Sequence, residues 1–184
     1  MPIYNVIGEQ IYNVPLTTVS LCLTLVYIVA TIVGCVSGPV INRLGRMRTL
    51  VIAIVLMIVG FAGSAIFIKS GFGVLTFLAC LFIAGVTAVY TPIYDAASDA
   101  LPVEENGRGV GILDLMMNTS ASIGVGVYSS LMASDTMGKG GLFGVGSGVE
   151  AQTSNMFWIM CAVSVLSMIV LFVFRKSFTA KRNV

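Results

Sequence analysis

Histidine is absent from the 184 residues of this chain, and only 10% of the residues are charged. Without histidine there is no Ser-His or Cys-His nucleophile system and no histidine metal site. A soluble domain carries about 25% charged residues. Here 57% of the residues are hydrophobic, and the mean hydropathy is +0.99. The shortage of charge therefore excludes an ordinary soluble domain.

Cysteine is scarce, and its positions do not suggest cross-links. The chain has four cysteines, which all lie inside apolar runs: Cys22, Cys35, Cys80 and Cys161. We interpret them as small hydrophobic side chains rather than as a disulfide framework or a metal site. The net charge is only +2, so nucleic acid is not expected as a partner. We expect no catalytic residue, metal or cofactor.

Five long apolar runs make up most of the sequence. A helix that spans a bilayer needs about 20 mostly apolar residues, and the runs at about 16–41, 49–68, 74–94, 109–133 and 155–174 meet this requirement. The sequence predicts an all-α membrane protein with five transmembrane helices. It would have a lead-in at 1–15, a transmembrane bundle at 16–174 and a basic tail at 175–184.

Lysine and arginine predict the orientation of these spans, because cytoplasmic loops carry an excess of both. If the connection at 42–48 is inside, eight basic residues lie inside, and only Lys69 and Lys139 lie outside. The N-terminal lead-in is then external, and the tail is cytoplasmic. We expect a multi-pass protein of the plasma membrane, with the lipid bilayer as its surroundings.

The connection at 38–48 reads GPVINRLGRMR and carries three arginines in eleven residues. It resembles the signature turn of the major facilitator superfamily, roughly G-x-L-A-D-R-x-G-R-K/R-x-x-L. The matching positions are Gly38, Asn42, Arg43, Gly45, Arg46 and Leu50. The resemblance implies that Gly38, Asn42, Arg43, Gly45 and Arg46 form a gating turn. We interpret Arg48 as a topology anchor only.

Asn42 departs from the family pattern, which usually has aspartate at this position. Asparagine keeps a hydrogen-bond acceptor but loses the charge, so ion pairing with Arg43 or Arg46 is lost from this position. Three acidic residues near the next inner connection are candidates to replace it: Asp99, Glu104 and Glu105.

The resemblance extends to the order of polar and apolar helices. The five predicted spans match helices 8 to 12 of the family, which makes them a partial, C-terminal bundle of that fold. The stretch GRGVGILDLMMNTSASIG resembles helix 11 of the fourteen-helix drug:proton antiporters, which include tetracycline and multidrug efflux pumps. This implies proton-coupled efflux of drugs or other small amphipathic molecules by alternating access. We expect the missing N-terminal half as a partner, and no transport by this chain alone.

The most polar span carries Asp114, Asn118 and Ser122 at positions i, i+4 and i+8. An ionisable residue inside a span is a functional candidate by default, and Asp114 is a candidate proton carrier. The alternative is a hydrated residue near the inner interface that pairs with Arg108 or with an arginine of the turn. Both interpretations remain open at this point.

Helix 74–94 adds further candidates for proton or substrate contact. Tyr90 and Tyr94 are placed to stack on an aromatic substrate, and Pro92 favours a kink. Asp95 follows at the membrane edge, where we interpret it as an interfacial residue.

Two expectations concern packing. Gly34 and Gly38 form a small-xxx-small pattern, which predicts a close helix–helix approach. The span at 49–68 has almost no polar side chain, so we expect it to face lipid on most sides.

The sequence leaves two other functional classes open. One is a non-catalytic membrane scaffold, a partner subunit or a non-functional transporter fragment. The other is an intramembrane aspartyl protease, because Tyr94-Asp95 and Gly109-x-Gly111 loosely resemble the YD and GxGD motifs. The spacing argues against a protease, since Ile112 and Leu113 separate the second glycine from Asp114.

Overall fold

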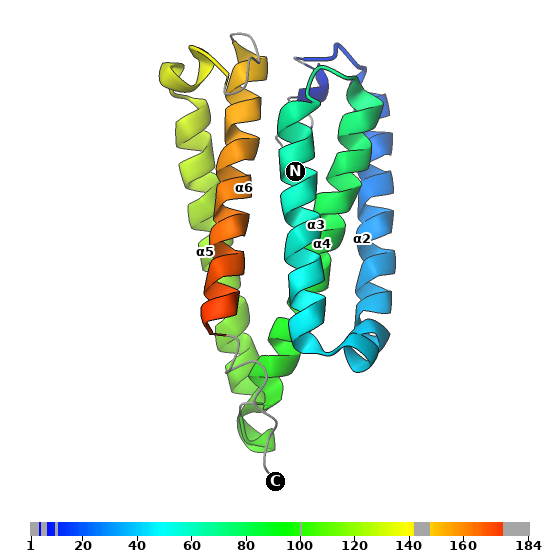
Figure 1. Ribbon diagram of the computed structural model, residues 1–184, viewed down its shortest axis with the longest axis vertical. Coiled ribbons are helices and arrows are strands. Elements are labelled where there is room, and N and C mark those ends of the chain that lie inside the picture. The colour runs from blue at the N-terminus through cyan, green and yellow to red at the C-terminus, as the bar shows by residue number, and fades with distance from the viewer. Residues whose placement is uncertain (1–3, 5–6, 10, 100, 142–147, 175–184) are drawn as a thin grey trace.

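The computed structural model describes residues 4, 7–9, 11–99, 101–141 and 148–174, and within these ranges all regular structure is helical. The long helices lie side by side, with α5 and α6 at one side of α3 and with α2 and α4 at the other (Figure 1). Two short 3-10 helices accompany them. The elements are α2 (Leu16–Leu44), α3 (Arg46–Ile66), α4 (Phe72–Asp99), η1 (Val103–Glu105), α5 (Asn106–Met132), η2 (Asp135–Gly138) and α6 (Val149–Val173).

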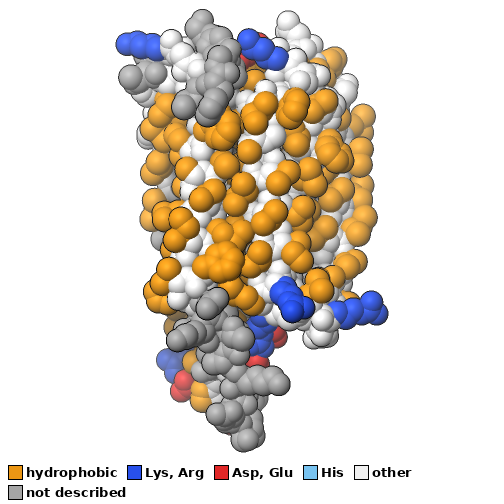
Figure 2. All heavy atoms as spheres, viewed as in Figure 1, with side chains coloured by type: hydrophobic (Ala, Val, Ile, Leu, Met, Phe, Trp, Pro, Cys, Tyr) orange, Lys and Arg blue, Asp and Glu red, His pale blue; other side chains and the backbone are white. Residues whose placement is uncertain are grey.

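All five long helices are apolar and long enough to cross a membrane. Figure 2 shows a hydrophobic band across the middle of one face, with lysine and arginine near both ends. A helix satisfies its own backbone hydrogen bonds, which the hydrocarbon core of a bilayer requires. The expected fold class, an all-α membrane protein with five spans, is confirmed.

The helix boundaries differ from the predicted ones where polar residues continue a helix. Helix α2 runs through Pro39 to Leu44, and α3 begins at Arg46, so Gly45 alone separates them. Likewise α6 begins at Val149 rather than near residue 155. Hydropathy marks where a chain leaves the hydrocarbon, whereas helical hydrogen bonding continues into the interface. The predicted basic tail at 175–184 lies outside the described residues, and the orientation of the bundle stays a prediction.

Helix α3 lies at the centre of the bundle, which corrects the expectation that it faces lipid on most sides. It packs extensively against both α4 and α6. In its most apolar window 39% of the residues are buried, more than in any other candidate span. A span with few polar side chains is therefore compatible with the interior as well as with lipid.

A close backbone approach joins α3 and α4 at two glycines. A Cβ atom on Gly60 would lie 2.8 Å from the backbone nitrogen of Phe82, and one on Gly85 would lie 2.6 Å from the carbonyl oxygen of Ala53. The predicted approach at Gly34 and Gly38 is wrong. A Cβ on Gly34 would make only an ordinary 3.5 Å contact with Thr87, and one on Gly38 would meet nothing within 4 Å.

The lead-in packs on the bundle at the end where α3 leads into α4. The hydroxyl of Tyr4 lies 2.5 Å from the Thr76 hydroxyl, and Tyr12 donates a hydrogen bond to the carbonyl of Ile68. Burial raises the pKa of Tyr4 to about 12. At the same end Lys69 and Glu150 form an ion pair at 3.6 Å, which connects α6 to the α3–α4 connection.

We predict that Gly85→Ala lowers the free energy of unfolding by about 1–3 kcal/mol, the usual cost of overpacking a core. The added methyl group has to displace the backbone of α3 at Ala53. SDS titration followed by the fluorescence of Trp158, the single tryptophan, measures this energy. Gly126→Ala is the matched control, since its Cβ would meet nothing within 4 Å. Equal destabilisation by both variants would contradict the prediction.

Candidate functional site

Gly45 forms the whole connection between α2 and α3. Its φ of +82° is a conformation that side chains rarely adopt. Its N–H donates to the carbonyl of Ile41 at 2.8 Å, and its carbonyl accepts a hydrogen bond from the Thr49 hydroxyl at 3.0 Å. The glycine of the signature turn therefore ends one helix and begins the next without a spacer.

Arg46, the first residue of α3, forms ion pairs with two carboxylates of α4. Its Nε lies 2.5 Å from Oδ2 of Asp95, and its NH2 group contacts Oδ2 of Asp99. A cation at a helix N-terminus interacts unfavourably with the helix dipole. The first turn of α3 holds no acidic residue that would offset this. The two carboxylates of α4 supply the missing negative charge.

The other residues of the turn lie at the surface. Asn42, Arg43 and Arg48 are exposed, and Gly38 is partly exposed. Of the three acidic residues suggested as replacements for the family aspartate, Asp99 contacts Arg46. Within the described part of the chain, no ion pair involves Glu104 or Glu105. The interpretation of Asp95 as an interfacial residue stays a prediction, and the structure adds its ion pair with Arg46.

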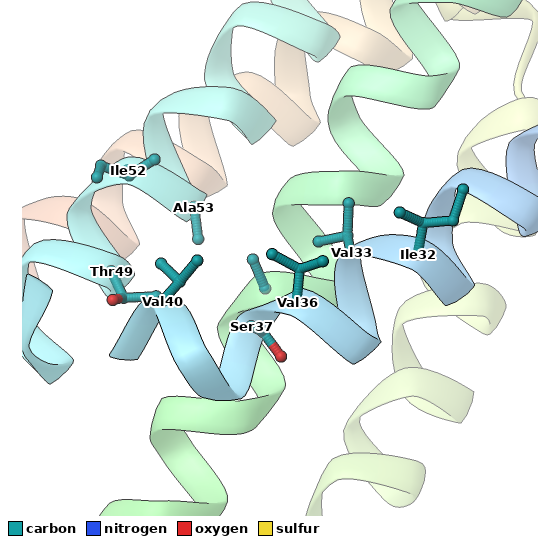
Figure 3. A pocket seen from close by; sticks show the side chains of 9 residues that line it. Ile32, Val33, Val36, Ser37, Val40, Thr49, Ile52 and Ala53 are labelled. Carbon is teal, nitrogen blue, oxygen red and sulfur yellow. The ribbon is translucent and has the colours of Figure 1, made fainter. Parts of the chain in front are cut away.

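A groove with a volume of about 220 Å³ separates α2 from α3 beside the turn. Figure 3 shows Val36 and Val40 of α2 facing Ala53 of α3 across this space. The Ser37 hydroxyl donates to the carbonyl of Gly34 and lies 2.7 Å from the Thr91 hydroxyl of α4. Thus α2 and α3 are joined by one glycine, and each packs more extensively on α4 than on the other.

Asp114 is held by a tyrosine rather than by an arginine. The Tyr94 hydroxyl of α4 donates to Oδ1 of Asp114 at 2.6 Å. The ring of Tyr94 stacks on that of Tyr90, with centroids 6.4 Å apart and an interplanar angle of 25°. No ion pair of Asp114 with Arg108 or with the turn arginines occurs among the described residues.

The polar positions of α5 continue along its exposed side. Asn118 donates to the carbonyl of Asp114 at 2.9 Å, and the Ser122 hydroxyl donates to the carbonyl of Asn118 at 3.0 Å. All three side chains are exposed, and none of the residues in the most apolar window of α5 is buried. The polar positions of α5 are therefore left uncovered by the helices that the structure describes.

Pro92 lies inside α4 and is buried. Because proline has no N–H, the carbonyl four residues earlier, that of Ala88, loses its helical donor. Ala88 lines the groove beside the turn. The kink expected at Pro92 stays a prediction, and α4 continues through it to Asp99 as one helix.

Consecutive residues of α4 connect the turn with the polar side of α5. Tyr94 reaches Asp114 of α5, and Asp95 reaches Arg46 of α3. The sequence shows that these residues are close along α4 but gives no indication of their partners. Within the ranges that the structure describes, no cluster of three metal-ligating side chains occurs.

Comparison with protein families identifies the class. The family model described as Major Facilitator Superfamily matches residues 1–184. The chain belongs to this superfamily of membrane transporters. No curated protein matches the chain, and no solved structure matches it.

We predict that Arg46→Gln and Asp95→Asn are coupled by about 0.5–1 kcal/mol in a double-mutant cycle of unfolding free energies. The expected coupling energy is small because the side chains of Arg46 and Asp95 are 25% and 44% exposed. Water therefore screens the ion pair. SDS titration of the two single variants and the double variant measures the coupling. Arg48→Gln, combined with Asp95→Asn, is the control, for which additive energies are expected. Additive energies for the Arg46 cycle would show that the ion pair contributes nothing.

Proposed function

We propose that this chain is part of a proton-coupled efflux carrier for drugs or other small amphipathic molecules in the plasma membrane. The observation that supports this most directly is the Asp114 carboxylate. It lies on the uncovered side of α5 and accepts a hydrogen bond from Tyr94. A titratable group at such a position binds and releases a proton when water reaches it from either side.

The exposed side of α5 requires a cover. A charged side chain at the centre of a bilayer costs about 2.5–3.5 kcal/mol on insertion scales, and such residues face protein or a water-filled cavity. Helix α2 also exposes hydroxyl groups, those of Ser20, Thr24 and Thr31. We infer that a second helical bundle, corresponding to the N-terminal half of a facilitator, covers α2 and α5. The transport pathway then lies between the two bundles.

In this proposal α4 couples the proton to the turn. Ionised Asp114 accepts the hydrogen bond of Tyr94, and protonation removes the negative charge that strengthens this bond. The neighbouring Asp95 holds Arg46 at the start of α3. A shift of this part of α4 on protonation then acts on the Arg46 ion pairs. The glycine turn between α2 and α3 allows the inner end of the bundle to respond.

The stacked rings of Tyr90 and Tyr94 support an amphipathic substrate. Aromatic faces attract apolar ring systems and organic cations. Because these rings lie next to Asp114, one site would offer a flat apolar contact and a negative charge. A proton that neutralises Asp114 would weaken the binding of a cation, which is the exchange that an antiporter requires.

We predict that Asp114→Asn reduces pH-gradient-driven efflux of ethidium at least tenfold. The amide keeps the shape of the side chain but does not carry a proton. The measurement is ethidium efflux from cells that express the chain together with its N-terminal half. Glu104→Gln is the control, since Glu104 is exposed on η1, and its efflux is expected to match that of the original chain.

Unchanged efflux in the Asp114→Asn variant would contradict the assignment of the proton site. If Asp114→Asn and Pro92→Ala are both silent, the scaffold interpretation gains. The need for a second bundle is tested separately with the purified chain alone in proteoliposomes. Ethidium flux driven by a pH gradient there would overturn it.

A further inference from the structure

A second cavity lies in the other half of the bundle, away from Asp114. It has a volume of about 360 Å³ and is lined by α3, α4, α5, α6 and the lead-in. Cavities of about 300–1,000 Å³ are typical of small-molecule sites. Tyr128, which lines it, is 14 residues beyond Asp114 on α5. At a rise of about 1.5 Å per residue, this separates the two positions by about 21 Å.

One wall of this cavity consists of phenylalanine rings from three helices. Phe61 of α3 stacks on Phe82 of α4, with centroids 5.0 Å apart and an interplanar angle of 22°. Phe157 of α6 lies next to Phe61, with centroids 6.5 Å apart. All three residues line the cavity. Such rings favour a flat aromatic guest through offset or edge contacts, which a flexible acyl chain does not reproduce.

Helix α5 contributes two small residues to the lining. Ala121 and Gly124 line the cavity, and a Cβ on Gly124 would meet nothing within 4 Å. The space next to Gly124 therefore stays open, while Val125 and Tyr128 of α5 also line the cavity. A larger residue at position 124 would occupy it.

Tyr128 supplies a polar group in this apolar space. It is only 9% exposed, and its hydroxyl has no hydrogen-bond partner among the residues that the structure describes. The hydroxyl of Tyr4, the other tyrosine in the lining, is already engaged with Thr76. The Tyr128 hydroxyl can donate a hydrogen bond to a ligand that carries an acceptor.

We propose that this cavity binds a planar aromatic molecule that carries one hydrogen-bond acceptor, with its ring against the phenylalanine wall and its acceptor on the Tyr128 hydroxyl. The site lies farther along α5 than Asp114, and its lining on that helix begins at Ala121. It requires neither a proton gradient nor a second bundle, so its test and the efflux test fail independently.

The test uses the purified full chain in phosphatidylcholine nanodiscs and two matched probes. 1-Acetylnaphthalene carries a carbonyl acceptor, and 1-ethylnaphthalene has nearly the same shape without it. Equilibrium dialysis measures binding, and empty nanodiscs give the amount that partitions into lipid. We expect saturable binding of both probes above the empty discs, with 1-acetylnaphthalene bound roughly tenfold more tightly, as one hydrogen bond allows.

Two pairs of variants locate the binding. Tyr128→Phe is expected to abolish the preference for 1-acetylnaphthalene while 1-ethylnaphthalene binds as before. Its control, Tyr27→Phe on the exposed side of α2, should keep the preference. Gly124→Leu is expected to block both probes. Gly126→Leu, which also adds a side chain to open space on α5, should block neither.

Several results would overturn the proposal. One is the absence of saturable binding above the empty discs. Another is unchanged binding in Gly124→Leu, which would place the probes elsewhere. A third is a combination of two results: palmitate fully displaces 1-acetylnaphthalene, and Tyr128→Phe still prefers 1-acetylnaphthalene over 1-ethylnaphthalene. The cavity would then be a groove for acyl chains.

Discussion

The bundle depends on the backbone contact between α3 and α4 at Gly60 and Gly85. In a bilayer the hydrophobic effect does not drive helices together, because lipid is as apolar as the side chains, and van der Waals packing of close backbones takes its place. At both glycines a Cβ would overlap with the facing backbone. The contact fixes the rotation and height of α4 against α3. Arg46 and Asp95 can form an ion pair because this register brings them to the same end.

In this register α4 is the element that connects the candidate functional residues. Its end carries Tyr94 and Asp95 as neighbours, and their side chains reach α5 and α3. Helix α5 packs much less extensively on the rest of the bundle than α3 does. The only described side-chain hydrogen bond from α4 to α5 is that of Tyr94 to Asp114. Among the long helices α5 therefore has the least extensive packing, and the Tyr94–Asp114 hydrogen bond joins it to α4.

Hydropathy and the turn at 38–48 were sufficient to predict five spans and the superfamily, because both depend on local sequence. Asp99 was among the candidate partners of the turn arginines, but the choice between it, Glu104 and Glu105 and the pairing with Asp95 were not predictable, since Arg46 meets these carboxylates only after two helices pack. The packing glycines were misassigned for the same reason. The spacing of Gly34 and Gly38 resembles a contact motif, but whether a glycine meets another helix depends on rotation. The sequence of α3 is mostly apolar, so it does not indicate whether its side chains face lipid or other helices.

Asn42 shows how the charge balance of the turn differs from the signature that it resembles. An aspartate there would place a negative charge on α2, close to the arginines that follow it. With asparagine the described ion pairs of Arg46 all lead to α4. The electrostatic link therefore joins α3 to α4 and leaves α2 held by packing and by the Ser37–Thr91 contact. Helix α2 therefore packs mainly on α4 rather than on α3, and it borders a groove beside the turn.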